Sequence, residues 1–468
     1  MSDINPYATI TELCRGYRER KFSPADVIEA QQAREDRLEP KLHAYITRYS
    51  DEACEKARSI AQEFDAAGEL PPLAGVPIAL KDLIDMEGRV TSGGSPERAS
   101  RVSPGTALIA QRLMSAGAII PGKTHTVEMA TGGWGTNEHL GAPWNPWDLE
   151  THRTPGGSSS GSGVAVAAGY CPGAIGTDTG GSVRLPAGWC GLVGLKVTEG
   201  TLPTEGILPL SSTLDTPGPM TRSVDDALLM FEVLKGSDPI GVGKQVAEQT
   251  GPFSAIGEPV KSMRFAVLPD EGRAEIDSEV LDAYDKSVSE LANLGAEIVV
   301  KAVPKEWDGF STLAVQMIIA YEGYRFNKEI IDDEAATMDQ WVKRRLVPGR
   351  SEFDDDAYRA TLEQRKSDLA EFEREFSDID AILTPTTLTP AIPLSEVDEY
   401  GSPARFTRAA NYLALCSLSV PNGFTEGGLP TSLMITCHGG QELTALRIGK
   451  AYEASQDWAN RHPPGLDA

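Results

Sequence analysis

The most informative stretch of the chain runs from residue 155 to residue 197 and reads PGGSSSGSGVAVAAGYCPGAIGTDTGGSVRLPAGWCGLVGLKV. It contains two clusters of glycine and serine, at 155–163 and at 176–182, and apolar residues follow each of them. A flexible linker is also rich in glycine and serine, but helix and strand signals do not border it so closely. The two clusters therefore belong to the interior of a folded domain.

The charge and glycine content of this region supports the same conclusion. Only five of the fifty residues from 151 to 200 are charged, against 24% of the whole chain, and thirteen of its 46 glycines lie between 156 and 200. Glycine lets the backbone come close to itself or to a ligand. We therefore expect this backbone to be buried and to border a ligand site.

Helix and strand signals alternate on both sides of this region. Ser23 and Pro24 form a helix start, 51–66 and 105–118 are helical, and 351–380 is a long, mostly acidic helical pattern. Strand signals lie at 76–80, 119–120, 174–177, 192–197, 265–268, 297–300, 379–383 and 431–436. The pattern predicts an α/β fold: a single large domain with a mixed, mostly buried β-sheet covered by helices on both faces.

Composition narrows the classes of partner. The chain has 468 residues and a formal net charge of −25, which disfavours nucleic acid or an anionic membrane surface as a partner. No apolar stretch approaches the roughly 18–20 residues that span a bilayer, and the N-terminus has no apolar signal core, so we expect a cytoplasmic protein. The six cysteines and six histidines show neither CxxC nor HExxH spacing, so we expect reduced thiols, no metal and no cofactor.

The second glycine-serine cluster suggests acyl-transfer chemistry. A phosphate-binding loop would need a GKS or GKT ending or a GxGxxG pattern, and neither occurs here. Consecutive backbone N–H groups beside Gly180 and Gly181 can instead bind a developing oxyanion, with the Ser182 hydroxyl placed to attack a carbonyl. Lys81, at the end of an apolar strand, is the candidate base if burial lowers its pKa from about 10.4 towards about 7–8. Ser158 could relay the proton between them.

At this point the sequence resembles the amidase-signature hydrolases. The segments GVPIALKDLID at 75–85, PGGSSSGSG at 155–163 and GTDTGGSVRLPAGWCGLVGLKVT at 176–198 match the hallmark segments of that family, and further motifs extend the resemblance over nearly the whole chain. The resemblance implies one domain over 1–468. In it a helical segment, 1–70, packs on a catalytic core, 71–235, and residues 260–468 complete the sheet and the substrate pocket.

The resemblance also implies a role for individual residues. Ser182 is the nucleophile, Ser158 the middle member in a cis peptide with Gly157, and Lys81 the general base and acid. The remaining assignments are an oxyanion hole and substrate contacts at Thr179, Gly180, Gly181, Ser182 and Ala130, and supporting residues Ser159, Asp178 and Arg184. For Asp178 and Arg184 a purely structural ion pair is the alternative. We expect the segments 125–150, 201–215 and 305–350 to shape the pocket.

The implied function is hydrolysis of a linear amide C–N bond. The substrate would be a small or medium carboxylic amide (acyl, aryl or half-amide), cleaved through a serine acyl-enzyme to a carboxylate and ammonia or an amine. The alternative is a glutaminase-type A subunit of a tRNA-dependent amidotransferase, from whose segment GRVSRYGL the chain departs with Thr204 in place of an arginine. A catalytically inactive binding module is a third possibility, and a homodimer is the candidate assembly.

Overall fold

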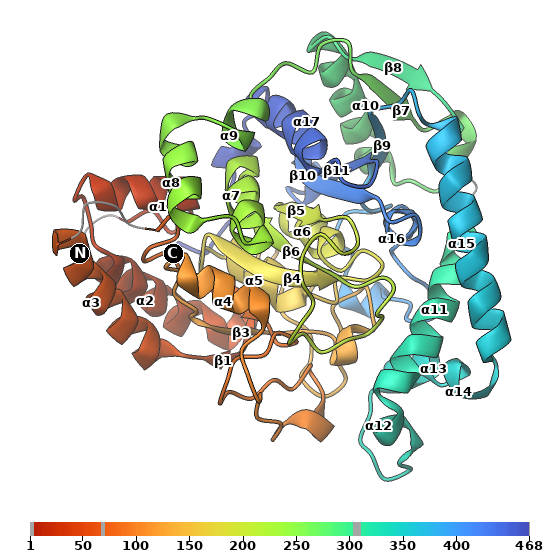
Figure 1. Cartoon of the computed structure of the whole chain (residues 1–468), viewed down its shortest axis with the longest axis horizontal. Helices are drawn as coiled ribbons and strands as arrows, with labels where there is room; N and C mark the ends of the chain where they lie inside the picture. The colour runs from red at the N-terminus through yellow and green to blue at the C-terminus, as the bar shows by residue number, and fades with distance from the viewer. Residues whose placement is uncertain (1–3, 67–70, 303–309, 468) are drawn as a thin grey trace.

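The computed structural model describes residues 4–66, 71–302 and 310–467 of the chain. One mixed sheet runs through the molecule, with the strand order β1-β3-β2-β4-β6-β5-β10-β11-β9-β7-β8 (Figure 1). Its strands are β1 (Tyr45–Arg48), β2 (Ile78–Lys81), β3 (Gly122–Thr124), β4 (Gly173–Asp178), β5 (Val193–Lys196), β6 (Thr216–Thr221), β7 (Arg264–Val267), β8 (Glu297–Val300), β9 (Ala381–Pro385), β10 (Cys416–Phe424) and β11 (Pro430–Cys437).

Parallel and antiparallel pairs both occur in this sheet. Strand β2 runs parallel to β3 and β4, and β7 runs parallel to β8 and β9, whereas the central strands from β4 to β11 pair antiparallel. The expected α/β class and mixed, buried sheet are therefore confirmed. Strands from 1–70, 71–235 and 260–468 all join the one sheet, and the division of the domain into those segments stays a prediction.

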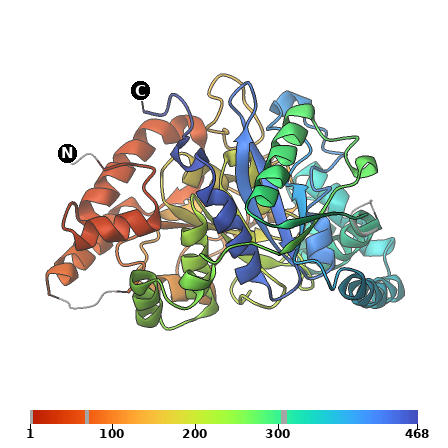
Figure 2. The same ribbon diagram turned by 90° about the horizontal axis from the view of Figure 1, so that it is seen from above.

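Helices cover both faces of the sheet (Figures 1 and 2). Helices α7, α10 and α17 lie against one face, and α5 and α6 lie against the other. The helices are α1 (Ile10–Arg18), α2 (Pro24–Leu42), α3 (Ser50–Ala66), α4 (Leu108–Ser115), α5 (Ser160–Ala167), α6 (Arg184–Cys190), α7 (Val224–Lys235), α8 (Pro239–Glu248), α9 (Pro252–Ala255), α10 (Ser278–Asn293), α11 (Phe310–Phe326), α12 (Lys328–Asp332), α13 (Gln340–Leu346), α14 (Pro348–Ser351), α15 (Asp355–Glu375), α16 (Arg408–Tyr412) and α17 (Glu442–Ala454).

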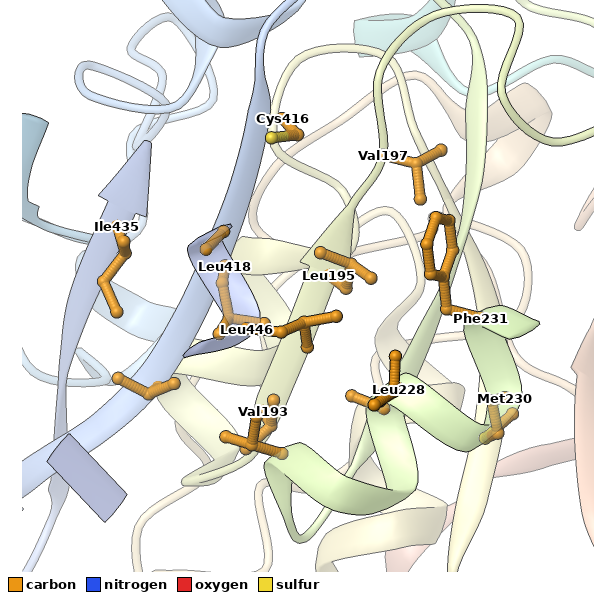
Figure 3. Packing of buried hydrophobic residues seen from close by; sticks show 14 of the residues in the cluster. Val193, Leu195, Val197, Leu228, Met230, Phe231, Cys416, Leu418, Ile435 and Leu446 are labelled. Carbon is orange, nitrogen blue, oxygen red and sulfur yellow. The ribbon is translucent and has the colours of Figure 1, made fainter. Parts of the chain in front are cut away.

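The largest hydrophobic core lies between the sheet and α7 and α17. Figure 3 shows Leu228 and Phe231 of α7 and Leu446 of α17 packing against Val193 and Leu195 of β5. These side chains are almost completely removed from solvent. At about 25 cal/mol per Å² of apolar surface, such burial is the main favourable term in the stability of the fold.

Most of the elements that the sequence predicts lie at the expected places, although many of the shorter helices were not predicted. Helix α2 begins with a capping box, in which Ser23 and Asp26 exchange side-chain and backbone hydrogen bonds. The strand expected at 119–120 is displaced, because Ile119 forms only an isolated bridge to Pro77 and β3 begins at Gly122. Strands β1, β6 and β10 were not predicted.

Candidate active site

Lys81 owes its position to the alternation of side chains along β2. Ile78 and Leu80 belong to the core that α7 covers, whereas Ala79 packs with Val164 and Ala165 of α5. Successive residues of a strand point to opposite faces of the sheet. Lys81 therefore falls on the same face as Ala79, which is the face that α5 covers, and the Gly157–Ser158 segment lies just before α5 in the chain.

Lys81 and Ser158 are in direct contact. Lys81 Nζ donates to Ser158 Oγ at 2.8 Å and to Thr177 Oγ1 at 2.8 Å, and both lysine and serine are completely buried. Burial lowers the pKa of Lys81 to about 7, although Asp215 and Asp178 oppose the shift. A lysine with such a pKa is partly neutral at physiological pH and can accept a proton.

Two contacts fix the backbone around Ser158. The Gly157–Ser158 peptide bond is cis, as the resemblance implies. The Ser158 carbonyl accepts hydrogen bonds from Thr126 Oγ1 at 3.0 Å and from the Val127 N–H at 3.1 Å. The segment that follows Val127 contains Ala130, so the same contacts connect Ser158 to the wall on which the sequence places a substrate contact.

Ser159 connects the glycine-serine segment to β4. Its hydroxyl donates to the Thr177 carbonyl at 3.2 Å and accepts from the Thr177 N–H at 3.2 Å. Gly176 makes the approach possible, because a Cβ at that position would lie 2.7 Å from Ser159 Oγ. Ser159 thus holds Thr177, the second hydrogen-bond partner of Lys81, and Thr177 is a site residue that the sequence analysis missed.

The turn that carries Ser182 is built around the buried Asp178 carboxylate. Asp178 Oδ1 accepts the Gly181 N–H at 2.8 Å, and Oδ2 accepts the Val183 N–H at 3.1 Å. Arg184 donates to both carboxylate oxygens, at 2.9 and 3.0 Å. Burial alone would raise the pKa of Asp178, but Arg184, with smaller contributions from Lys196 and Asn411, holds that pKa well below its ordinary value. The carboxylate is therefore ionised and fixes the turn.

These contacts decide which N–H groups of the turn remain available. The Gly181 N–H, one of the four expected oxyanion donors, is already taken by Asp178. Within the described part of the chain, those of Thr179, Gly180 and Ser182 have no acceptor. Gly181 contributes through its conformation instead, with φ at +134° and a Cβ position only 2.4 Å from Thr407 Oγ1. Any other residue there would displace the turn.

Two residues that the sequence analysis missed support this turn from outside. Asp215 Oδ1 accepts from Thr179 Oγ1 at 2.5 Å, and burial raises the pKa of Asp215 to about 6. Asn411 of α16 donates to Asp178 Oδ1 at 2.9 Å and accepts from Arg184 at 2.7 Å. Asp215 and Asn411 lie outside the two glycine-serine clusters, and the sequence analysis gave neither of them a role in the site.

Ser182 lies on the wall of a cavity of about 290 Å³, together with Ala130, Thr179 and Gly180. Ser182 is 8% exposed as a residue, whereas Ser158 is fully buried. Ala130 has a left-handed backbone, with φ at +60°, which is uncommon for a residue other than glycine. The structure therefore gathers the candidate nucleophile Ser182 and the expected substrate contacts Thr179, Gly180 and Ala130 around one cavity, whereas Lys81 and Ser158 are buried and do not line it.

The other cavity residues come from separate parts of the chain. The segments 125–150, 201–215 and 305–350 all contribute, although residues 303–309 lie outside the described residues. The segment 399–408 also lines the cavity, which the sequence analysis did not specify. The apolar lining is formed by Leu185, Leu210, Ile319, Ala320, Pro348, Phe353 and Ala404.

Three further expectations concern features outside the cavity. All six cysteines are free thiols. The described residues contain no group of three or more His, Cys, Asp or Glu side chains that could hold a metal ion. In the same part of the chain, every helix is too short or too polar to pass through a lipid bilayer.

Comparisons with known proteins give the family of the chain. Residues 26–446 match the family model described as Amidase. The A subunit of the glutamyl-tRNA(Gln) amidotransferase from Koribacter versatilis (strain Ellin345) is 33% identical over 480 residues, which cover 96% of this chain and 98% of the relative.

Solved structures show the same likeness. A crystal structure of an amidase is 28% identical, with a TM-score of 0.85 over 96% of this chain and 100% of the other. The native peptide amidase from Stenotrophomonas maltophilia is 27% identical, with a TM-score of 0.82 over 99% of this chain and 100% of the other. The chain therefore belongs to the amidase family and is a hydrolase of amide C–N bonds.

Proposed function

We propose that the chain is a free-standing amidase that cleaves a small or medium carboxylic amide through an acyl-enzyme on Ser182. The observation that carries the proposal is the 2.8 Å contact between Lys81 Nζ and Ser158 Oγ in a fully buried site. Burial gives the lysine the pKa of about 7 that a general base needs near neutral pH. The cavity beside Ser182 would hold the acyl group.

In the proposed reaction Ser182 Oγ attacks the amide carbon, and its proton passes through Ser158 to neutral Lys81. The N–H groups of Thr179, Gly180 and Ser182 stabilise the negative charge that develops on the carbonyl oxygen. When the C–N bond breaks, Lys81 returns the proton through Ser158 to the leaving nitrogen. Water then attacks the Ser182 ester with the same proton transfers, which releases the carboxylate and restores the serine.

A second candidate function is the glutaminase-type A subunit of a tRNA-dependent amidotransferase, which the names of the curated relatives favour. The charges of the cavity argue against glutamine as the substrate. Its α-ammonium group would need a carboxylate partner, and Glu399, the one carboxylate among the described lining residues, is paired with Arg345 at 2.7 Å. We therefore place this function second.

Ammonia release by the purified chain from a panel of aliphatic and aryl amides, half-amides and glutamine distinguishes the two functions. A free-standing amidase should turn over members of the panel without any partner, and Ser182→Ala should serve as the inactive blank. Glutamine hydrolysis that appears only when a co-purified protein is added would support the amidotransferase role and contradict our first proposal.

The proposal assigns Asp178 a positioning role, which Asp178→Asn tests. We expect the free energy of unfolding to fall by about 3–5 kcal/mol, because Arg184 would stay buried without a charged partner. In the protein that remains folded, kcat should fall at least about tenfold while KM changes less than about threefold, since the loosened turn carries Ser182 and the oxyanion donors. Denaturant unfolding and steady-state kinetics measure the two effects.

Asp356→Asn is the matched control for Asp178→Asn. Asp356 pairs with Arg359 on the surface of α15, and both side chains are exposed, so losing the charge should leave both the stability and kcat nearly unchanged. An Asp178→Asn protein with lowered stability but unaltered kcat would reduce Asp178 and Arg184 to a structural ion pair.

A further inference from the structure

The cavity beside Ser182 carries an excess of positive charge. The charged residues among its described lining are Arg344, Arg345, Arg408 and Glu399, so two positive charges remain after one ion pair is formed. The chain as a whole has a formal net charge of −25. A cavity with an excess of positive charge attracts an anionic group, even in a protein that is acidic as a whole.

Arg345 and Glu399 account for the one ion pair. Arg345 Nη2 donates to Glu399 Oε2 at 2.7 Å and to the Glu399 carbonyl at 2.8 Å, and Nη1 donates to the Thr131 carbonyl at 3.0 Å. Glu399 also accepts from Thr136 Oγ1. Both side chains are therefore held in the wall of the cavity, and each carboxylate oxygen of Glu399 already accepts a hydrogen bond from a residue other than Arg408.

Arg408 is the arginine without a counter-ion. It begins α16, it is half-buried, and its Nη2 donates to the uncharged Ser402 Oγ at 2.7 Å. In the described part of the chain no carboxylate lies within ion-pair distance of it. Burial, and then the charge of Arg345, lower the pKa of Arg408 to about 10, so the guanidinium is still a cation at neutral pH.

Arg408 also lies close to the reacting end of the cavity. Its Cγ is 3.6 Å and its Nε 4.0 Å from the position that a Cβ on Gly180 would take. Gly180 is one of the proposed oxyanion donors and precedes Ser182 by two residues. Arg344 is exposed, and its guanidinium lies 4.4 Å from the centre of the Tyr400 ring, so it adds positive charge nearer the solvent.

We propose that the enzyme selects half-amides of dicarboxylic acids and that Arg408 binds their free carboxylate. This inference rests on the proposed function, because it assumes that the amide group reacts at Ser182. A guanidinium matches a carboxylate geometrically and forms strong charge-assisted hydrogen bonds with it. A cavity of about 290 Å³ lies at the lower end of ligand-pocket volumes, which suits a short acyl chain.

The test compares the purified enzyme on three amides of equal chain length: glutaramate, valeramide and 5-aminovaleramide, which end in a carboxylate, a methyl and an ammonium group. Ammonia release gives kcat/KM for each amide. We expect kcat/KM for glutaramate to exceed that for valeramide by about 10–100-fold, mainly through a lower KM, because a hydrogen bond to a charged group changes affinity by about this factor. The enzyme should react poorly with 5-aminovaleramide.

Substitutions at Arg408 separate a charge effect from a structural one. Arg408→Gln should reduce the preference for glutaramate over valeramide at least tenfold, and Arg408→Glu should shift the preference towards 5-aminovaleramide. Arg359→Gln, which removes an exposed arginine on α15, is the control and should keep the glutaramate preference. Equal kcat/KM on all three amides, or an unchanged preference in Arg408→Gln, would overturn the inference.

Binding of the product glutarate makes the test independent of turnover. By calorimetry, glutarate should bind Ser182→Ala at least about tenfold more tightly than it binds Ser182→Ala with Arg408→Gln. Hydrolysis of valeramide without any glutaramate preference would leave the proposed function intact and remove this inference. Conversely, the enzyme could bind glutarate through Arg408 but hydrolyse no amide. That result would support the anion site and contradict the proposed function.

Discussion

Ser182→Ala should lower kcat/KM for amide hydrolysis by at least about 10⁴-fold. Removing the nucleophile of a serine hydrolase has an effect of this order, because the oxyanion donors and substrate binding alone give only residual catalysis. The substitution keeps the backbone N–H groups of Thr179, Gly180 and position 182, so substrate and product should still bind. Ammonia release measures the lost turnover, and calorimetry with a product carboxylate measures the retained binding.

Ser160→Ala is the matched control for this prediction. Ser160 is also a buried serine of the glycine-serine region, but it lies at the start of α5 and its hydroxyl contacts His125 at 3.2 Å. The Ser160→Ala enzyme should keep an activity within a few fold of that of the unaltered enzyme. Retention of more than a few per cent of activity in Ser182→Ala, with the fold intact by circular dichroism, would exclude Ser182 as the nucleophile.

Lys81, Ser158 and Ser182 could be proposed from the sequence because each lies next to a strong local signal. Lys81 ends an alternating strand, and both serines lie in glycine-rich turns beside apolar segments. Such signals depend on neighbouring residues alone. The structure adds what brings the turns together, namely the face of β2 on which Lys81 falls and the hydrogen bonds that Ser159 makes to Thr177.

Strand β6 shows why part of the sheet escaped prediction. It reads TPGPMT, and two prolines and a glycine argue against a central strand. The prolines are tolerated because β5 pairs with β6 only at Met220 and Thr221. The edge of β6 that faces β5 therefore needs no N–H donors at Pro217 and Pro219. This pairing depends on two strands, and the sequence of β6 alone contains no sign of it.

The cavity residues from the segment 399–408 could not be predicted for a related reason. Glu399 and Arg408 belong to a segment more than 200 residues after Ser182, and isolated charges there look like ordinary surface residues. Only the folded chain shows that Glu399 is paired with Arg345 and that Arg408 has no counter-ion among the described residues. The proposed reaction thus uses residues that local signals mark, whereas the proposed choice of substrate depends on contacts between distant segments.

Lys81→Met should lower kcat/KM by about 10²–10⁴-fold, the usual contribution of a positioned general base. Methionine has a similar length to lysine and needs no hydrogen bond. The substitution also removes a titratable group whose charged form is disfavoured by burial. The unfolding temperature of Lys81→Met should therefore be at least as high as that of the unaltered enzyme. Activity loss together with retained stability would show that the lysine acts in the reaction itself.

The pH dependence of kcat/KM gives a second, independent readout of Lys81. The neutral amine is the active form and its pKa is lowered to about 7, so activity should rise tenfold per pH unit below pH 7 and level off above it. In Lys81→Met this limb should disappear, and the residual activity should instead increase towards alkaline pH as hydroxide replaces the missing base. If Lys81→Met kept the same rise in activity up to pH 7, that titration would belong to another group. Asp215 would then be the first candidate, because burial raises its pKa to about 6.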